Sequence, residues 1–385
     1  MSNLKRCLDN VTENESFDKK SIIYDKRDMN RVVRSINKNF VINNTDPYIK
    51  NALDNVYIPR KIIIKKEKVT INKEINSLSD LLQLIIDYPI TENAEYNINL
   101  TRLHKIKQPL IELNNMIGLN DLKNSILDQI LFYVQDLHLN SGIDYMHTVL
   151  YGPPGTGKTE IAKIIGRIFS KLGILKNETF RKVVRSDLIA GYLGQTAIKT
   201  TKVIEEALDG VLFIDEVYAL GNSEKRDSFS KECIDTICET LSDYKDRLMV
   251  IIAGYEEEIN ECFFSYNKGL KSRFPWSFKT DKYTPDDLNA IFIKKVNDIK
   301  WKLDVDELIC TKFFKDNIDA FLYYGRDIEI LLLKIKIVHS RRIFCLNNDM
   351  KTIINNADLV NGFELFKKNS NIEKQPDNII YTMYN

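Results

Sequence analysis

The segment LYGPPGTGKTEIAKIIG, residues 150–166, carries the spacing G-x-x-x-x-G-K-[ST] between an apolar run and a helical pattern. Gly152, Gly157, Lys158 and Thr159 satisfy that spacing. Such a loop curls so that successive backbone N–H groups point inward at phosphate oxygens, and glycine is needed where a Cβ would block the approach. The sequence therefore predicts a phosphate-binding loop, with Lys158 reaching the β- and γ-phosphates of ATP and the Thr159 hydroxyl ligating Mg²⁺. The other loop residues expected to bind the nucleotide are Pro153, Pro154, Gly155, Thr156 and Glu160.

A second motif, VLFIDE at residues 211–216, has four apolar residues followed by two carboxylates. We expect Asp215 to anchor Mg²⁺, directly or through water, and Glu216 to polarise the attacking water. An apolar strand that simply ends at solvent would look the same in isolation. Because this one follows a phosphate loop, it favours hydrolysis of a nucleoside triphosphate over nucleotide storage.

Charge and amino-acid composition indicate which partners and which cellular compartment to expect. The chain has 385 residues, and its 55 Lys plus Arg nearly balance its 54 Asp plus Glu, so no global field attracts it to nucleic acid or to an anionic membrane. Six cysteines without a CxxC pair, beside four histidines, favour reduced thiols over a disulfide framework or a zinc site. The polar N-terminus and the absence of an apolar run near the ~20 residues of a membrane span predict a soluble, cytoplasmic protein.

Alternating patterns in the middle of the chain predict the fold class. Four apolar runs, separated by helical stretches, are typical of strands in a parallel sheet covered by helices. The runs are HTVLY, RKVV, VLFID and RLMVIIA. After residue 283 the pattern is helical, as in a small bundle. Before residue 75 the chain is polar and mildly basic, with short β-type runs such as YIPRKIIIKK, and either a docking module or a solvated arm explains it.

Four segments together resemble the AAA+ ATPases, and within them the branch of red-type Rubisco activase (CbbX) and stage V sporulation protein K. The resemblance runs from about residue 117 to 278 and more weakly to about 345. Its segments are LYGPPGTGKTEIAKIIG, RSDLIAGYLGQTAIKTTKVIEEALDGVLFIDEVYAL, RLMVIIAGYEEEI and NKGLKSRF. It implies a P-loop α/β domain with a five-stranded parallel sheet flanked by helices, a helical lid, and a ring, usually hexameric, with ATP between subunits.

The resemblance and the composition together divide the chain into four expected parts, of which the first matches no family. Residues 1–105 are expected to form an N-terminal region of unknown fold, partly disordered at its start. Residues 106–283 are expected to form the ATP-binding α/β domain and residues 284–367 the helical lid. A polar tail follows at residues 368–385.

The family pattern also assigns roles near the nucleotide. It places Ile117 and Gly118 beside the adenine, although a short apolar lead into a helix explains them as well. Arg326, in YYGRDIEILL, falls where a lid arginine contacts the γ-phosphate. Tyr255 departs from the pattern, because many members have Asn or Thr as a nucleotide sensor there; its hydroxyl could orient water, or Asn260 could compensate.

Two further roles depend on a ring. Arg273, in LKSRF, falls where an arginine finger reaches the ATP of the next subunit, with a solvated surface arginine as the alternative. Tyr192 and Leu193, in AGYLGQ, fall on the loop that faces the central channel and would grip an extended polypeptide. The alternative is that Tyr192 packs against its own domain.

Two main hypotheses for function remain. The first is an ATP-driven ring that remodels or threads a protein client. The second is a motor or loader associated with nucleic acid through the basic N-terminal region, which is less favoured because the AGYLGQ loop lacks clustered Lys and Arg. A regulatory scaffold that binds ATP but hydrolyses it slowly is a weaker third hypothesis. The residues that argue against it, all present, are Lys158, Asp215, Glu216 and Arg273.

Overall fold

The computed structural model describes residues 67–91, 93–139, 145–192, 194–222, 227–267, 269–345 and 348–373. Contacts divide the chain into the units Met1–Glu67 and Lys68–Asn385. The β-type run YIPRKIIIKK lies outside the described residues.

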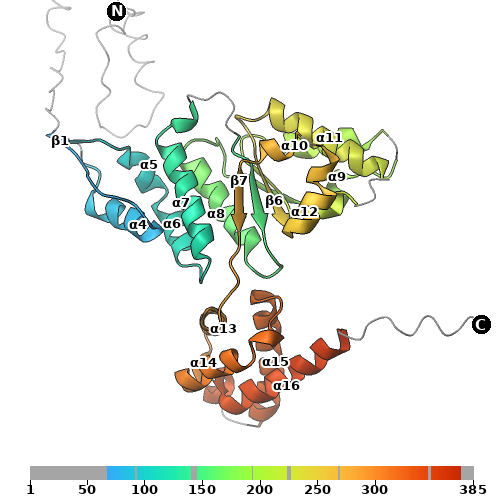
Figure 1. Ribbon diagram of the computed structural model, residues 1–385. Helices are drawn as coiled ribbons and strands as arrows, with labels where there is room; N and C mark the ends of the chain where they lie inside the picture. The colour runs from blue at the N-terminus through green and yellow to red at the C-terminus, as the bar shows by residue number, and fades with distance from the viewer. Residues whose placement is uncertain are drawn as a thin grey trace, which may run out of the picture. The chain divides into compact units, whose positions relative to one another are not determined.

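A five-stranded parallel sheet forms the centre of the second unit, with the strand order β4-β5-β6-β3-β7 (Figure 1). Its register pairs Val149 with Ile252 and Val211 with Met249. The four apolar runs predicted as strands form β3 to β6, and the fold predicted from the resemblance is confirmed. The strands are β3 (Thr148–Tyr151), β4 (Phe180–Val183), β5 (Val211–Ile214), β6 (Met249–Gly254) and β7 (Trp276–Lys279).

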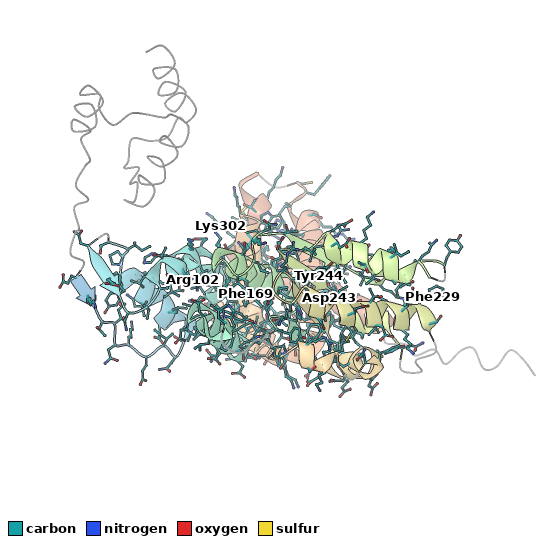
Figure 2. The ribbon with its side chains drawn as sticks, turned by 90° about the horizontal axis from the view of Figure 1, so that it is seen from above. Arg102, Phe169, Phe229, Asp243, Tyr244 and Lys302 are labelled. Atoms are coloured by element: carbon teal, nitrogen blue, oxygen red, sulfur yellow. The ribbon has the colours of Figure 1, made fainter. Side chains whose placement is uncertain are left out.

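The three central strands β3, β5 and β6 are buried on both faces, which is why they read as continuous apolar runs, whereas the edge strands β4 and β7 are partly exposed. Side chains alternate along a strand, so Phe213 packs into one core and Leu212 and Ile214 into another. The first core contains the side chains of α7 and α8, among them the fully buried Phe169 (Figure 2). The second contains those of α9 to α12. These helices are α7 (Asn120–Val134), α8 (Lys158–Lys171), α9 (Arg185–Leu188), α10 (Thr196–Glu205), α11 (Ser228–Asp243) and α12 (Glu256–Cys262).

Helices that precede α7 belong to the first core. Leu81 of α4 and Leu110 of α6 are buried in the same cluster as Ile165 of α8. Arg102 of α5 donates to Asp136, just beyond α7, at 2.6 Å. Residues 68–105, which the sequence places in the N-terminal region, therefore pack with the α/β domain. These elements are β1 (Glu67–Val69), α4 (Leu78–Asp87), β2 (Ala94–Tyr96), α5 (Leu100–Lys105) and α6 (Lys107–Asn114).

The C-terminal part is helical, as predicted, with an added two-stranded parallel sheet of β8 and β9. Its core is aromatic, with Phe321 stacked against Phe363 and Phe366. The last helix continues to Glu373, past the start of the predicted polar tail. The elements are α13 (Pro285–Asp298), β8 (Lys302–Asp304), α14 (Glu307–Asp316), α15 (Gly325–Ile343), β9 (Ile353–Asn355) and α16 (Asn356–Glu373). None of the helices in the described residues is long and apolar enough to cross a bilayer.

Candidate nucleotide-binding site

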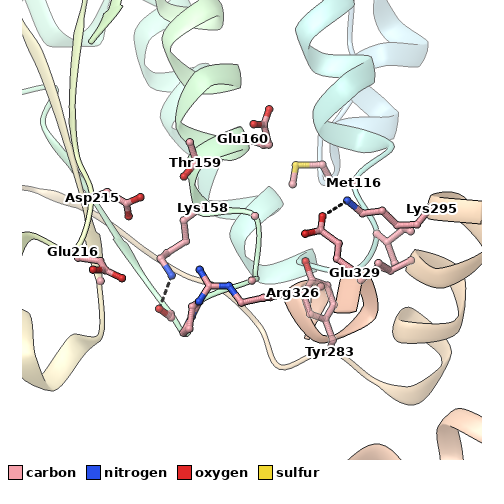
Figure 3. A pocket seen from close by; sticks show the side chains of 18 of the residues that line it. Met116, Lys158, Thr159, Glu160, Asp215, Glu216, Tyr283, Lys295, Arg326 and Glu329 are labelled. Atoms are coloured by element: carbon pink, nitrogen blue, oxygen red, sulfur yellow. Dashed lines mark hydrogen bonds and ion pairs between the residues drawn. The ribbon is translucent and has the colours of Figure 1, made fainter. Parts of the chain in front are cut away.

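A cavity of about 550 Å³ opens where the carboxyl ends of β3, β5 and β6 meet the lid helices α13 and α15. Ligands in open α/β sheets bind outside the carboxyl ends of the strands, so this is the expected place for a nucleotide. Figure 3 shows Lys158, Asp215 and Glu216 toward one end of the cavity. Met116 and Glu329 lie toward the other end.

The glycine-rich loop runs from β3 to the first residue of α8. Gly155 and Gly157 have φ values of +79° and +81°, a region that side chains other than glycine rarely adopt. A Cβ on Gly152 would lie 1.8 Å from Thr280 Oγ1, and one on Gly155 would lie 2.1 Å from the carbonyl oxygen of Tyr323. The loop therefore fits only with glycine at these points, between the end of β7 and the lid.

Lys158 is the first residue of α8, and its ammonium lies inside the loop. Nζ donates to the carbonyl oxygens of Gly152 and Pro153, each at 2.7 Å. Burial lowers the pKa of Lys158 from 10.5 to about 8, while the carboxylates of Asp215 and Glu216 act in the opposite direction. A partly desolvated ammonium interacts more strongly with an anion than one in water does, which suits it to phosphate.

The two carboxylates of VLFIDE follow β5, one strand away from β6 and two from β3. Both line the cavity. Glu216 has a φ of +49°, an uncommon backbone conformation for a residue with a side chain and one that concentrates at functional sites. Asp215 Oδ2 accepts a hydrogen bond from Lys182 Nζ at 2.6 Å.

The lid closes the cavity from the opposite side. Gly325, the first residue of α15, donates its N–H to the carbonyl oxygen of Gly155 at 3.2 Å. Arg326 follows Gly325 and lines the cavity. In Figure 3 it lies between Lys158 and Glu329. Lys295 of α13 donates to Glu329 of α15 at 2.5 Å, and both also line the cavity.

Most of the residues that the sequence predicts for the nucleotide lie together. Those that line the cavity are Ile117, Pro154, Gly155, Gly157, Lys158, Thr159, Glu160, Asp215, Glu216 and Arg326. Gly118, Pro153 and Thr156 do not line it. Gly118 instead lies against Tyr283, and the buried Thr156 donates its hydroxyl to the carbonyl oxygen of Pro153 at 2.8 Å.

Several lining residues were missed or left open by the sequence. Tyr255 does line the cavity, with its ring 6.3 Å from that of Tyr218. Asn260, suggested as its substitute, does not line it and donates to Glu256 within α12. Other residues line the cavity although no role was predicted for them from the sequence. They include Met116, Tyr218, Tyr283, Ile291, Lys294, Lys295, Asp298 and Glu329.

Arg273 and Tyr192 lie outside this cavity. Arg273 is half-buried, with Nε donating to Ser242 Oγ at 2.8 Å and Nη1 to the carbonyl oxygen of Gly269 at 2.6 Å. Tyr192, on the loop before α10, is 74% exposed, so it is not packed against its own domain. Leu193 lies outside the described residues.

Comparisons with known proteins identify the family. Residues 148–274 match the model of the ATPase family associated with various cellular activities (AAA). Over 288 residues the chain is 43% identical to a putative cfxQ-like protein, R730, of Acanthamoeba polyphaga mimivirus, covering 74% of this chain and 71% of that protein.

Other similarities cover less sequence or are more distant. The chain is 38% identical over 200 residues to the ESX-3 secretion system protein EccA3 of Mycolicibacterium smegmatis, covering 50% of this chain and 32% of EccA3. The crystal structure of the FIGL-1 AAA domain with ADP superposes with a TM-score of 0.49 at 17% identity, covering 77% of this chain and 92% of that domain. The narrower branch of red-type Rubisco activase stays a prediction. From the glycine loop, the paired carboxylates and a mimiviral relative matched over most of its length, it follows that the chain belongs to the AAA+ ATPases and is an ATP hydrolase.

Proposed function

We propose that this ATPase forms a ring, as a hexamer, and uses ATP to remodel or thread a protein client. The observation that carries the proposal is Tyr192, a large aromatic side chain that is 74% exposed on a loop away from the nucleotide cavity. An exposed aromatic contact suits an extended polypeptide, because it grips without reading sequence. The ESX-3 secretion system protein named among the relatives supports a client of protein rather than nucleic acid.

The donor atoms at the phosphate end fit magnesium. Thr159 offers a hydroxyl and Asp215 a carboxylate, and Mg²⁺ is held in nucleotide sites by few protein oxygens together with substrate phosphates and water. When bound, Mg²⁺ neutralises charge that develops on the phosphates. Thr159 and Asp215 are the residues that would hold it.

Four further residues have parts in hydrolysis in this proposal. The ammonium of Lys158 binds the β- and γ-phosphates, and the carboxylate of Glu216 orients and polarises the attacking water. Arg326 contacts the γ-phosphate from the lid. Arg273 acts on the nucleotide of a neighbouring subunit in this proposal, and its place outside the cavity of its own chain supports that role.

The test of threading is Tyr192→Ala. Because the side chain is exposed, the free energy of unfolding should change by less than about 0.5 kcal/mol, and basal ATP hydrolysis should stay at the wild-type rate. Stimulation of hydrolysis by a client protein should be lost. A variant that keeps full client stimulation would remove the case for threading through this loop.

The variant Glu216→Gln offers a way to identify the client protein. It should bind ATP without turnover and so hold the client long enough for isolation. Single-stranded DNA, duplex DNA and RNA should be assayed alongside the isolated protein, and stimulation of wild-type hydrolysis by a nucleic acid alone would favour the motor or loader.

A further inference from the structure

Lys182 forms an ion pair with the carboxylate expected to hold magnesium. It lies in β4, opposite Phe213 of β5 in the parallel register. Paired residues share a face of the sheet, and Asp215 follows Phe213 by two positions, so all three side chains lie on one face. Accordingly Lys182 Nζ lies 5.8 Å from the centroid of the Phe213 ring and 2.6 Å from Asp215 Oδ2. The contact is built by the pairing of two neighbouring strands.

The pair is partly shielded from water. The side chain of Asp215 is 23% exposed and that of Lys182 is 46% exposed. Lys158 also lies near this carboxylate, but its ammonium is bonded to the carbonyl oxygens of Gly152 and Pro153. Lys182 does not line the nucleotide cavity, so it acts through Asp215 rather than on phosphate.

The Lys182 ammonium would weaken the binding of a divalent cation to the Asp215 carboxylate in two ways. It occupies one carboxylate oxygen, and it adds a positive charge that repels the metal. The repulsion between a single and a double charge a few ångströms apart, screened as in water, corresponds to about a tenfold change in a binding constant.

We infer that Lys182 weakens metal binding at Asp215, and so hastens the release of metal and ADP after each hydrolysis. Lys182 is therefore a positioning residue that sets how long product stays bound. Product release limits the turnover of many enzymes. A residue that speeds product release therefore raises the turnover rate. The inference rests on the proposed magnesium site at Thr159 and Asp215.

The test compares Lys182→Met with wild type in the full chain. The affinity of the ADP-bound protein for Mn²⁺, measured by electron paramagnetic resonance, should rise about tenfold in Lys182→Met. The rate of ADP release should fall by a similar factor. Lys182→Gln should behave like Lys182→Met. Lys182→Arg, which keeps the charge, should bind Mn²⁺ with nearly the wild-type affinity. The difference between wild type and Lys182→Met should shrink at high salt, because the pair is partly exposed.

Arg181→Met is the matched control. Arg181 precedes Lys182 in β4, its side chain is 49% exposed, and it pairs with Glu206 at 3.7 Å, so the variant removes an equal charge and an ion pair from the same strand. Its metal binding should match wild type. Unchanged or weaker Mn²⁺ binding in Lys182→Met would overturn the inference. Asp215→Asn separates the two proposals: if it leaves Mn²⁺ binding unaltered, the magnesium site itself is wrong.

Discussion

The charge of the Lys158 ammonium depends on its burial in the site. Its pKa is lowered to about 8 by burial, so it is protonated below that pH and loses its proton above it. Phosphate binding needs the protonated form. Affinity for ATP should therefore be nearly constant below about pH 7, fall about twofold by pH 8 and fall about tenfold by pH 9.

Lys158→Arg provides the comparison, because a guanidinium stays charged over this range. Its affinity for ATP, weaker or not, should be flat between pH 7 and 9 by calorimetry, with circular dichroism confirming the fold at each pH. Parallel pH profiles for wild type and Lys158→Arg would contradict the assignment of the pH dependence to this ammonium.

At this scale the sequence predicts the residues whose spacing is local. The glycine loop and the paired carboxylates are read directly from neighbouring positions, and both line the cavity. The ion pair between Lys182 and Asp215 could not be predicted, because it depends on the register between β4 and β5. Glu329 and Lys295 were missed for a similar reason, since they meet only through the packing of two lid helices.

At the scale of elements, the contact between the glycine loop and α15 sets where the lid lies. Gly155 accepts the N–H of Gly325 at 3.2 Å, and a Cβ on Gly155 would collide with the carbonyl oxygen of Tyr323 at 2.1 Å. Gly155→Ala should displace the start of α15 and with it Arg326. We expect affinity for ADP to fall at least tenfold, and amide exchange at Gly325 to accelerate, as measured by mass spectrometry.

Gly173→Ala is the control for backbone strain. Gly173 has the same φ of +79°, but a Cβ there would meet nothing within 4 Å. Both variants should lose about 1 kcal/mol of stability from the left-handed conformation. Only Gly155→Ala should lose nucleotide affinity; an equal effect in both would show that strain, and not the lid contact, is responsible.

The sequence predicts the elements with long, regular patterns. It gave no sign of β8 and β9, because strands of three residues carry too little periodicity. Nor could it show that α4 packs into the core of the α/β domain, because the partner of an apolar helix face is chosen by tertiary packing.

At the scale of the whole molecule, the proposed ring would place Arg273 of one chain at the nucleotide of the next. Arg273 is held by Ser242 and Gly269, outside the cavity of its own chain. If subunits share sites, Arg273→Ala should bind ATP nearly as wild type does and hydrolyse it at least a thousandfold more slowly. Since Arg273 has contacts within its own chain, thermal unfolding of Arg273→Ala and Arg273→Lys must first show that the fold survives.

Mixing two inactive variants tests the sharing of sites. Lys158→Ala lacks a working cavity but keeps Arg273, and Arg273→Ala has the reverse defect. In a closed ring with head-to-tail contacts, each junction of the right pair restores one complete site, so an equal random mixture should regain about a quarter of the wild-type sites. The ATP hydrolysis rate should pass through a maximum near equal proportions and be near zero at both ends. Because each variant is inactive alone, any recovered rate must come from junctions between chains. A flat, near-zero rate at every ratio, in mixtures shown by differential tagging to contain both variants in one assembly, would mean that each chain completes its own site and that Arg273 has another role.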